Sequence, residues 1–352
     1  MVRFATRLSA PYPSVKKLVW SLLIFVSGML FGLIATTSSQ KLDLFDLFGF
    51  GANVEGRIAD ENLFRSASMV LKKHEYPYTV VPKVAFLFLT RGPLPLTPLW
   101  ERFFHGHEDF FSVYVHTVPG YKLNVSKSSP FYDREIPSQD TQWGSITLTD
   151  AEKRLLANAL LDVSIERFVL LSESCIPLHD FSTIYKYLTE SAHSFVDSYD
   201  NPGITAGGRY NRRLIPYIML SDWRKGAQWF EMNRFLALRI ISETKYYPQF
   251  KKYCRRHCYP DEHYMPTYVA MFFPTLNANR TLTWVDWSRG GGHPSTYGGA
   301  DIKERFLQSI RNRWKCQYNY GETTTCYLFA RKFSHSALEP LLSLASSTVM
   351  KY

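Results

Sequence analysis

The N-terminal part of the chain contains an apolar run that determines where the rest of the sequence can fold. Residues 18–35 read LVWSLLIFVSGMLFGLIA and carry no charge. At about 1.5 Å per residue, a helix of this length nearly crosses a hydrocarbon core of about 30 Å. Because basic residues stay on the cytosolic side, we expect a cytosolic tail over 1–17, a transmembrane signal anchor over 18–35 and a lumenal remainder. The tail has four charged residues, all of them basic: Arg3, Arg7, Lys16 and Lys17.

A cleaved signal peptide is the alternative interpretation of this run. The apolar part of a signal peptide usually covers about 7–15 residues and ends at an A-x-A-like site. The run here is longer and no clear site of that kind follows it, so we favour an uncleaved anchor and a type II topology. The N-x-S/T sequons at Asn124 and Asn279 would then face the lumen as candidate N-glycosylation sites.

Beyond the anchor the sequence divides into a spacer and a large domain. Residues 36–82 contain no long periodic segment, and we interpret them as a stem with short elements. The chain is 45% hydrophobic and 16% aromatic, which excludes a disordered protein. Residues 83–352 are long enough for one lumenal domain with its own core.

Short apolar runs alternate with helical patterns in this domain. The segments 83–90 (KVAFLFLT), 110–116 (FFSVYVH) and 168–172 (FVLLS) predict buried strands. A T-x-x-E capping box at Thr149 predicts the start of one helix, and Asp180 is expected to cap another. The alternation indicates an α/β fold with parallel strands.

Ligands of such folds bind beyond the carboxyl ends of the strands. Thr90 and Arg91 follow one predicted strand and Glu173 follows another, so these loops are candidates for a ligand site. An ordinary polar loop is the alternative for each. Further along, 226–230 (GAQWF) predicts a short strand, and Asn233 is expected to cap a helix that runs to about Thr244. Two further helices are expected, one over 250–257 and one that begins near Asp261.

The net charge of +10 is unevenly distributed. Residues 207–256 contain 12 basic and 3 acidic residues, and the N-terminal tail holds four further basic residues. Because most of this excess would be lumenal, nucleic-acid binding is disfavoured. A local anionic group such as a diphosphate fits the pattern better.

The five cysteines fit an oxidising compartment. Cys254 and Cys258 can pair with each other or with Cys316 and Cys326, and the sequence leaves the three connectivities open. Cys175 follows a buried strand, so we expect a free thiol there.

Metal binding has little support in the sequence. Cys254 and Cys258 have histidines nearby, but Cys-x3-Cys is not a typical zinc spacing. No D-x-D segment occurs, and the nearest approach is the loop-like Asp133-Arg-Glu135. We therefore expect no metal, and expect that protein cations would hold a nucleotide diphosphate.

Two segments carry candidate chemistry. Pro260-Asp-Glu-His263 places two acids at a predicted helix start, where they could cap the helix or serve as a base. The segment 284–294 combines Trp284 and Asp286 with three glycines, a pattern that suits sugar binding but equally a buried aromatic pair and a loop. Neither a P-loop nor G-x-G-x-x-G spacing is present.

Six ordered segments make residues 83–333 similar to a known family. The segments are KVAFLFLTRGPLP, FVLLSESCIPLHDF, KGAQWFEM, YPDEHYMPT, TWVDWSRGGGHPSTY and CYLFARKF. They resemble the core-2/I-branching β-1,6-N-acetylglucosaminyltransferases (glycosyltransferase family 14), most closely the plant brittle-culm-type branch. The resemblance implies a GT-A-like, Rossmann-type mixed sheet flanked by helices, behind a single transmembrane helix and stem in the Golgi membrane.

The resemblance also implies an activity and its residues. It implies inverting, metal-independent transfer of a sugar, N-acetylglucosamine in this family, from a UDP-sugar to a glycan or glycoprotein hydroxyl. Glu262 matches the family's general base, and Arg313 and Lys332 match the cations that hold the diphosphate. Trp284 matches an acceptor-stacking tryptophan. Asp286 also falls in the acceptor site, where animal enzymes carry tyrosine.

Two other classes of function remain open at this stage. The difference at Asp286 is compatible with a membrane-anchored carbohydrate-binding or scaffold protein that lacks catalysis. A glycosidase would need two carboxylates placed across the scissile bond, and the sequence supports only Glu262.

Overall fold

A computed structural model describes residues 26, 50–70, 80–255, 257–312 and 314–345. The predicted tail over 1–17, the predicted anchor over 18–35 except Val26, and Arg313 lie outside the described residues. Within those ranges, no helix combines the length and the apolar character that crossing a membrane requires. The chain forms two compact units, 1–59 and 60–352.

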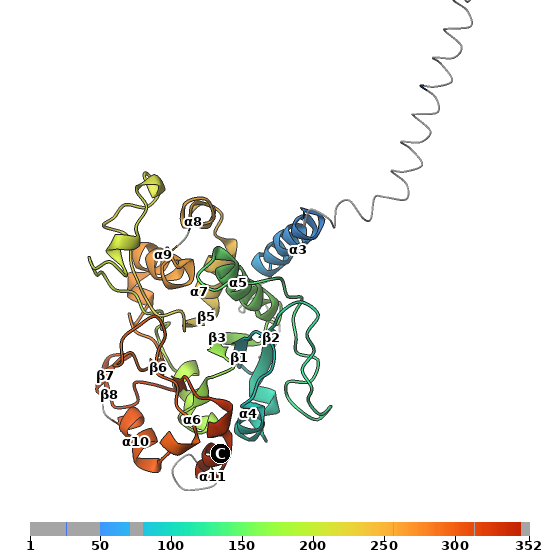
Figure 1. The fold of residues 1–352 in the computed structure, drawn as a ribbon, viewed down its shortest axis with the longest axis vertical. Helices are drawn as coiled ribbons and strands as arrows, with labels where there is room; N and C mark the ends of the chain where they lie inside the picture. The colour runs from blue at the N-terminus through green and yellow to red at the C-terminus, as the bar shows by residue number, and fades with distance from the viewer. Residues whose placement is uncertain (1–25, 27–49, 71–79, 256, 313, 346–352) are drawn as a thin grey trace, which may run out of the picture. The chain divides into compact units, whose positions relative to one another are not determined.

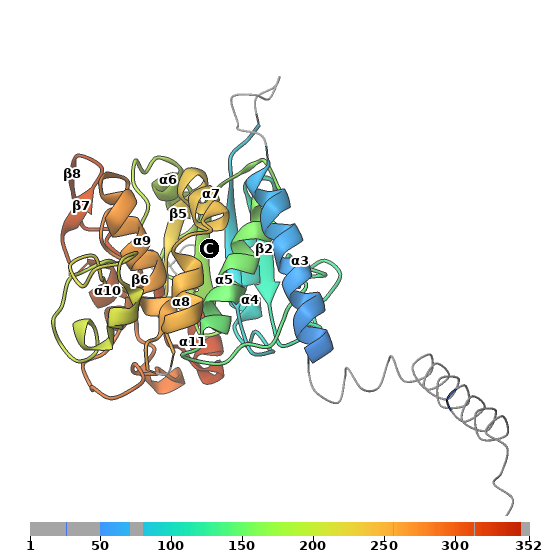
Figure 2. The same ribbon diagram turned by 90° about the horizontal axis from the view of Figure 1, so that it is seen from above.

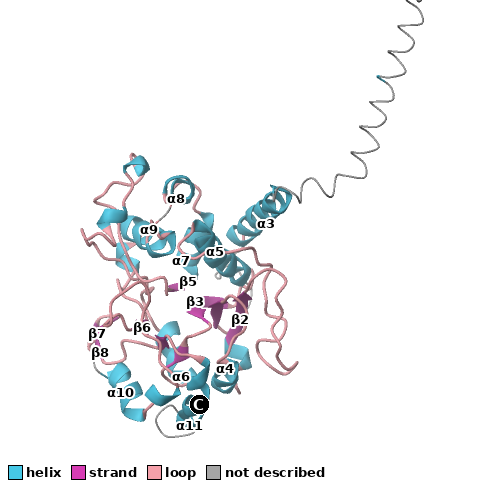
Figure 3. Cartoon of the chain, viewed as in Figure 1, coloured by secondary structure: helices cyan, strands magenta, loops and turns pink. Residues whose placement is uncertain are grey.

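The second unit is organised by a four-stranded sheet with the order β2-β1-β3-β5. Its three long strands are β1 (Lys83–Leu89), β2 (Phe111–His116) and β3 (Ile165–Ser172), which are parallel. They confirm the three apolar runs predicted as strands. The short strand β5 (Glu231–Asn233) pairs antiparallel with β3, so the sheet is mixed. Figure 3 shows its strands in magenta between cyan helices.

The strand predicted over 226–230 is wrong. Those residues form a loop, and β5 begins only at Glu231. The loop instead gives single hydrogen bonds to separate parts of the unit. The amide of Gly226 binds the carbonyl of Glu262 at 2.9 Å, and the carbonyl of Phe230 accepts from Leu170 at 3.0 Å.

A second sheet lies near the carboxyl-terminal part of the chain. It has the order β4-β9-β6, with β4 (Ile176–Pro177) antiparallel and β6 (Thr283–Val285) parallel to β9 (Phe329–Arg331). A separate hairpin consists of β7 (Cys316–Tyr318) and β8 (Gly321–Thr323).

Helices cover both faces of the main sheet, and each face has its own apolar core. Figure 1 shows α5 and α7 on one side of the sheet and α4 and α6 on the other, and Figure 2 shows α5 beside β2. One core includes α5 (Ile146–Leu160), α7 (Arg234–Ser242), α8 (Tyr247–Tyr253) and α9 (Tyr264–Phe272). The other includes α4 (Thr97–Phe104), α6 (Phe181–Thr189), α10 (Glu304–Asn312) and α11 (Leu338–Ala345).

Two of the three helix caps predicted from the sequence are confirmed. Asp180 accepts a hydrogen bond from the Thr183 amide and Asn233 accepts one from the Leu236 amide, both at 2.9 Å, which confirms them as N-caps. The capping box at Thr149 is wrong, because α5 begins one turn earlier and its N-cap is Ser145.

The boundaries around the basic stretch also differ from the prediction. Helix α8 runs from Tyr247 to Tyr253, so only 250–253 of the predicted 250–257 are helical; beyond them the Cys254–Cys258 disulfide and the left-handed backbone of His257 (φ 54°) turn the chain. Helix α9 begins at Tyr264 and not near Asp261, and Pro260–Glu262 forms a separate 3₁₀ helix.

Part of the predicted stem is helical. Helix α3 (Phe50–Ser68) is 19 residues long, so the expectation of only short elements over 36–82 is wrong. From Asp60 onward its residues belong to the compact unit 60–352. There the Asp60 carboxylate forms an ion pair with Arg154 of α5, with an N–O distance of 2.7 Å.

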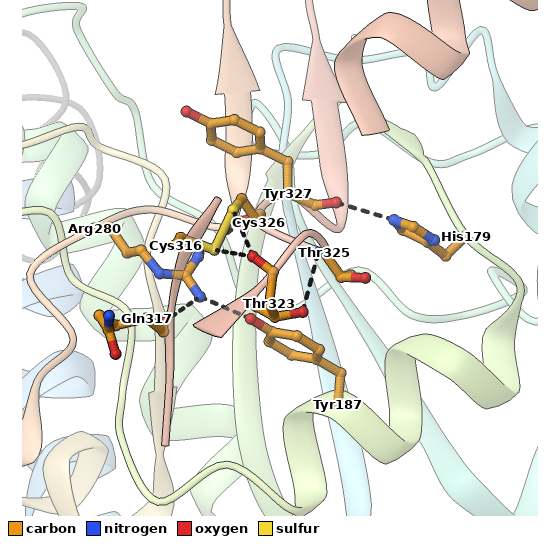
Figure 4. Close-up of a disulfide and its surroundings, with 9 residues drawn as sticks. All are labelled: His179, Tyr187, Arg280, Cys316, Gln317, Thr323, Thr325, Cys326 and Tyr327. Atoms are coloured by element: carbon orange, nitrogen blue, oxygen red, sulfur yellow. Dashed lines mark hydrogen bonds between the residues drawn. A yellow bond between two sulfur atoms is a disulfide. The ribbon is translucent and has the colours of Figure 1, made fainter. Parts of the chain in front are cut away.

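The structure selects one of the three disulfide connectivities. Cys254 pairs with Cys258 and Cys316 pairs with Cys326, while Cys175 is a buried free thiol as predicted. Figure 4 shows the second bridge beside Arg280, whose guanidinium donates to the Cys326 carbonyl at 2.7 Å. The bridge thereby ties β7 to the segment that leads into β9, and Arg280 links that segment to the chain before β6.

Candidate active site

Glu262 lies in the 3₁₀ helix Pro260–Glu262, which a close backbone approach fixes in place. The carbonyl of Glu262 accepts the Gly226 amide at 2.9 Å. A Cβ added to Gly226 would lie 1.7 Å from the Asp197 carbonyl oxygen, so only glycine fits between the two backbones. The KGAQW segment therefore has a physical role, which is to hold the 3₁₀ helix against the chain at Asp197.

Two cations hold the Glu262 carboxylate. Its Oε2 atom accepts a hydrogen bond from Arg209 Nη1 at 2.6 Å and lies 3.4 Å from Lys225 Nζ. The Arg209 guanidinium also stacks on the Tyr259 ring, 4.2 Å from its centroid. The Glu262 side chain is 25% exposed, so it is a candidate for contact with an incoming hydroxyl.

The neighbouring acid, Asp261, has a different environment. It is buried, and burial followed by the charge of Glu262 raises its pKa to about 7. Glu152 of α5 is also buried; burial and, secondarily, the charge of Asp261 raise its pKa well above the usual range. Gln228 donates to Glu152 at 2.8 Å. The site therefore combines one partly exposed, cation-paired acid with two buried acids whose raised pKa values favour the protonated form.

We expect Asp261→Asn to change how stability depends on pH. A folded-state pKa raised above the unfolded value gives stability that is present at low pH and is lost as pH rises toward 7. The variant lacks that loss. The difference in free energy of unfolding between the variant and the wild type should therefore shift in favour of the variant by up to about 4 kcal/mol from pH 4 to pH 8. Urea unfolding at pH 4, 5.5 and 8 measures this. The exposed-site control Asp140→Asn should run parallel to wild type, and a parallel curve for Asp261→Asn would contradict the prediction.

The two predicted acceptor residues lie at and just after strand β6. Trp284 is half-buried and packs against Tyr297 and Phe306, with ring centroids 5.9 and 6.2 Å away. The Asp286 carboxylate accepts from the Tyr297 hydroxyl at 2.5 Å and from the Ser288 amide at 2.9 Å. These hydrogen bonds, that of Tyr297 first, hold the pKa of Asp286 well below its usual range. Asp286 thus organises the glycine-rich loop that follows it.

The predicted donor-side residues lie at the carboxyl ends of β1, β3 and β9. Thr90 is buried, and its hydroxyl accepts the Gly92 amide at 3.1 Å, so it shapes the loop. Lys332 directly follows β9. Its pKa is lowered by burial and then by Arg331, while Glu173 and Arg91 also act on it electrostatically. The structure therefore brings Arg91, Glu173 and Lys332 into one electrostatic neighbourhood.

Arg331 connects this neighbourhood to the glutamate. Its guanidinium lies 4.0 Å from the centroid of the Trp229 ring. Trp229 lies in the same loop whose Gly226 amide binds the Glu262 carbonyl. One loop thus contacts both the candidate base and the strand that presents Lys332.

Sequence reasoning missed several residues of the site. Arg209 is 53 residues from Glu262 along the chain, and no local pattern relates the two. Two further tryptophans, Trp143 and Trp287, are 54% and 52% exposed in loops, and the sequence predicts neither of them as a site residue. For Trp287 the signal was present in the segment around Asp286, whereas Trp143 stands in an unremarkable loop.

The described residues contain no group of three or more His, Cys, Asp or Glu side chains that could hold a metal ion. The two cysteines of the rejected zinc interpretation are joined in the Cys254–Cys258 disulfide.

A mixed α/β domain with a cation-paired, partly exposed glutamate is compatible with a sugar-transferring enzyme, and comparison with known proteins defines the class. The sequence model of the Core-2/I-Branching enzyme family matches residues 84–311. The chain belongs to this family and is a glycosyltransferase.

A particular relative extends the match beyond the family model. The chain is 35% identical over 308 residues to Glycosyltransferase BC10 of rice (Oryza sativa subsp. japonica). The alignment covers 75% of this chain and 76% of the rice protein. The family match includes Glu262 and Trp284 but ends before Arg313 and Lys332.

Proposed function

We propose that this protein is an inverting glycosyltransferase that moves a sugar from a UDP-sugar to a glycan or glycoprotein hydroxyl without a metal ion. N-acetylglucosamine is the sugar we propose from the family resemblance. The observation that supports the proposal most strongly is the Glu262 carboxylate, which Arg209 and Lys225 hold in place while a quarter of its side chain stays exposed. A base for a hydroxyl must be both positioned and within reach of its substrate.

The proposed reaction is a single displacement. Glu262 accepts the proton of the acceptor hydroxyl, whose oxygen forms a bond to the anomeric carbon. The bond from that carbon to the diphosphate oxygen breaks, and UDP leaves with the electron pair. Lys332 and Arg313 would stabilise the charge that develops on the diphosphate, as fixed cations do in a site that excludes water. Arg91 is a further cation in the neighbourhood of Lys332.

The cellular setting is part of the proposal. We propose a GT-A-like lumenal domain on a type II signal anchor in the Golgi membrane, based on residues 18–35 and the family resemblance. Asn124 and Asn279 are exposed in the structure, so both sequons can accept a glycan there. Trp284 and the loop organised by Asp286 would contact the acceptor.

UDP binding without a metal tests the donor site. We expect calorimetry in EDTA to detect UDP binding to the wild-type protein, because protein cations replace the metal. Lys332→Ala and Arg313→Ala should each weaken binding by about 10–100-fold, as expected when a charge-assisted contact is lost. Lys303→Ala, at an exposed lysine before α10, is the control. Binding that disappears in EDTA would overturn the metal-independent mechanism, and equal affinity in all variants would overturn the cation assignment.

A further inference from the structure

We propose that Trp143, together with Tyr259 and His293, forms a second sugar-binding subsite for the acceptor, next to the one at Glu262. The acceptor would then be an oligosaccharide chain, with one sugar at the reacting position and a neighbouring sugar on Trp143. This inference rests on the proposed function of Glu262 and goes beyond it, because it assigns new residues and a class of acceptor.

The first observation is an exposed aromatic cluster built from three separate loops. Trp143 precedes α5, Tyr259 precedes the 3₁₀ helix and His293 ends the glycine run. The Trp143 ring centroid lies 5.2 Å from that of Tyr259 and 5.4 Å from that of His293. A tryptophan that stays 54% exposed while two other loops hold its ring leaves a large apolar surface in water. Such a surface, rimmed by polar groups, is typical of a binding site.

The second observation is that the chain backbone is shaped to keep this cluster together. Gly144 has a φ of 72°, and a Cβ at this position would lie 3.0 Å from Cε1 of the Tyr259 ring. Tyr259 itself adopts a left-handed backbone with a φ of 53°. A non-glycine residue rarely has this conformation, and it persists where the surroundings determine it. The Trp143 loop and the Tyr259 turn are thus fitted to each other.

The third observation connects the cluster to the candidate base. The Tyr259 ring also contacts the Arg209 guanidinium, 4.2 Å from the ring centroid, and Arg209 Nη1 donates to Glu262 at 2.6 Å. Trp143 is therefore linked to Glu262 through two intermediate side chains. In our proposal Trp143 therefore contacts a neighbouring sugar of the acceptor and not the reacting hydroxyl.

The chemistry of the cluster suits a sugar ring. The face of an indole carries negative charge density and attracts the polarised C–H groups of a pyranose. His293 is exposed at the edge of the cluster and Arg209 is near its base, so both can serve hydroxyl groups. A uracil base could also stack on an exposed tryptophan, and the experiment below separates the two occupants.

The test measures acceptor binding as a function of chain length. Wild-type protein saturated with UDP is titrated with β-1,4-linked glucose oligomers and β-1,3-linked galactose oligomers of one to four sugars, and binding is measured by calorimetry. We expect at least one series to bind about tenfold more tightly from the second sugar onward. Trp143→Ala should remove this gain without changing the affinity for the single sugar, and Trp143→Phe should keep part of it. Tyr320→Ala, at a 97% exposed aromatic residue of the β7–β8 turn, is the matched control.

The outcomes are distinct from those that test the base. Glu262→Gln should keep the length-dependent gain, because binding does not need proton transfer, so failure of the base assignment leaves this measurement valid. A gain that persists in Trp143→Ala, or the absence of any gain in wild type with both series, would overturn the subsite. Loss of UDP affinity in Trp143→Ala and Trp143→Phe would also overturn it, because the ring would then bind the nucleotide.

Discussion

Replacing Glu262 with glutamine is expected to lower kcat by about 10²–10⁴-fold, the usual contribution of a general base. Glutamine has the same shape and can still accept the hydrogen bond from Arg209, so the site should keep its structure. It cannot take a proton from the acceptor hydroxyl. UDP release from UDP-N-acetylglucosamine and other UDP-sugars, with glycan acceptors present, measures the loss.

Two measurements keep this result interpretable. UDP affinity of Glu262→Gln should equal that of wild type, since the diphosphate is assigned to other residues. Glu322→Gln is the matched control, because that glutamate lies on the β7–β8 hairpin with a side chain that is 63% exposed. Equal turnover by Glu262→Gln and wild type would show that another group takes the proton.

The sequence predicts the main sheet well, because its strands are buried on both faces. Continuous apolar runs such as 83–90 need no context to be recognised, and β1 and β3 follow them closely. The short strand β5 could not be placed in the same way. Three residues carry no periodic pattern, and only pairing with β3 defines where the strand begins.

The sequence also predicts the first residue of a helix only in part. Ser145 and Thr149 both have side chains that can cap a helix, and the T-x-x-E pattern favours Thr149. The structure uses Ser145, which leaves Thr149 fully buried in the first turns of α5. The choice depends on packing of the helix against the sheet, which is not encoded in the local pattern.

The candidate site, too, is predictable from the sequence only in part. The PDE segment identifies two adjacent acids, and nothing local says which one is exposed. In a 3₁₀ helix with about three residues per turn, successive side chains point in directions about 120° apart. Asp261 therefore points into the core and Glu262 toward Arg209 and Lys225. The partners of both acids come from distant segments, so they can only be known from the fold.

The buried ion pair between Arg167 and Glu231 leads to the largest expected effect on stability. Arg167 on β3 donates twice to the Glu231 carboxylate on β5, with distances of 2.6 and 2.7 Å, and the two side chains are 5% and 1% exposed. The same guanidinium donates to the carbonyls of Ser191 and His193 at 3.2 and 2.8 Å. The pair therefore joins β3, β5 and the loop after α6 in the interior.

Glu231→Gln should lower the free energy of unfolding by about 3–5 kcal/mol, because it leaves the Arg167 charge buried without a counter-charge. Urea unfolding of the purified protein at constant pH measures the change. The double variant Arg167→Met with Glu231→Leu removes both charges and should lose less than Glu231→Gln alone, even though two carbonyls lose their donor. A loss below about 1 kcal/mol for Glu231→Gln would mean that the charge is solvated or neutralised. Strand β5 directly follows the loop that binds Glu262. We therefore expect Glu231→Gln to lower turnover as well, even at temperatures well below the one at which the protein unfolds.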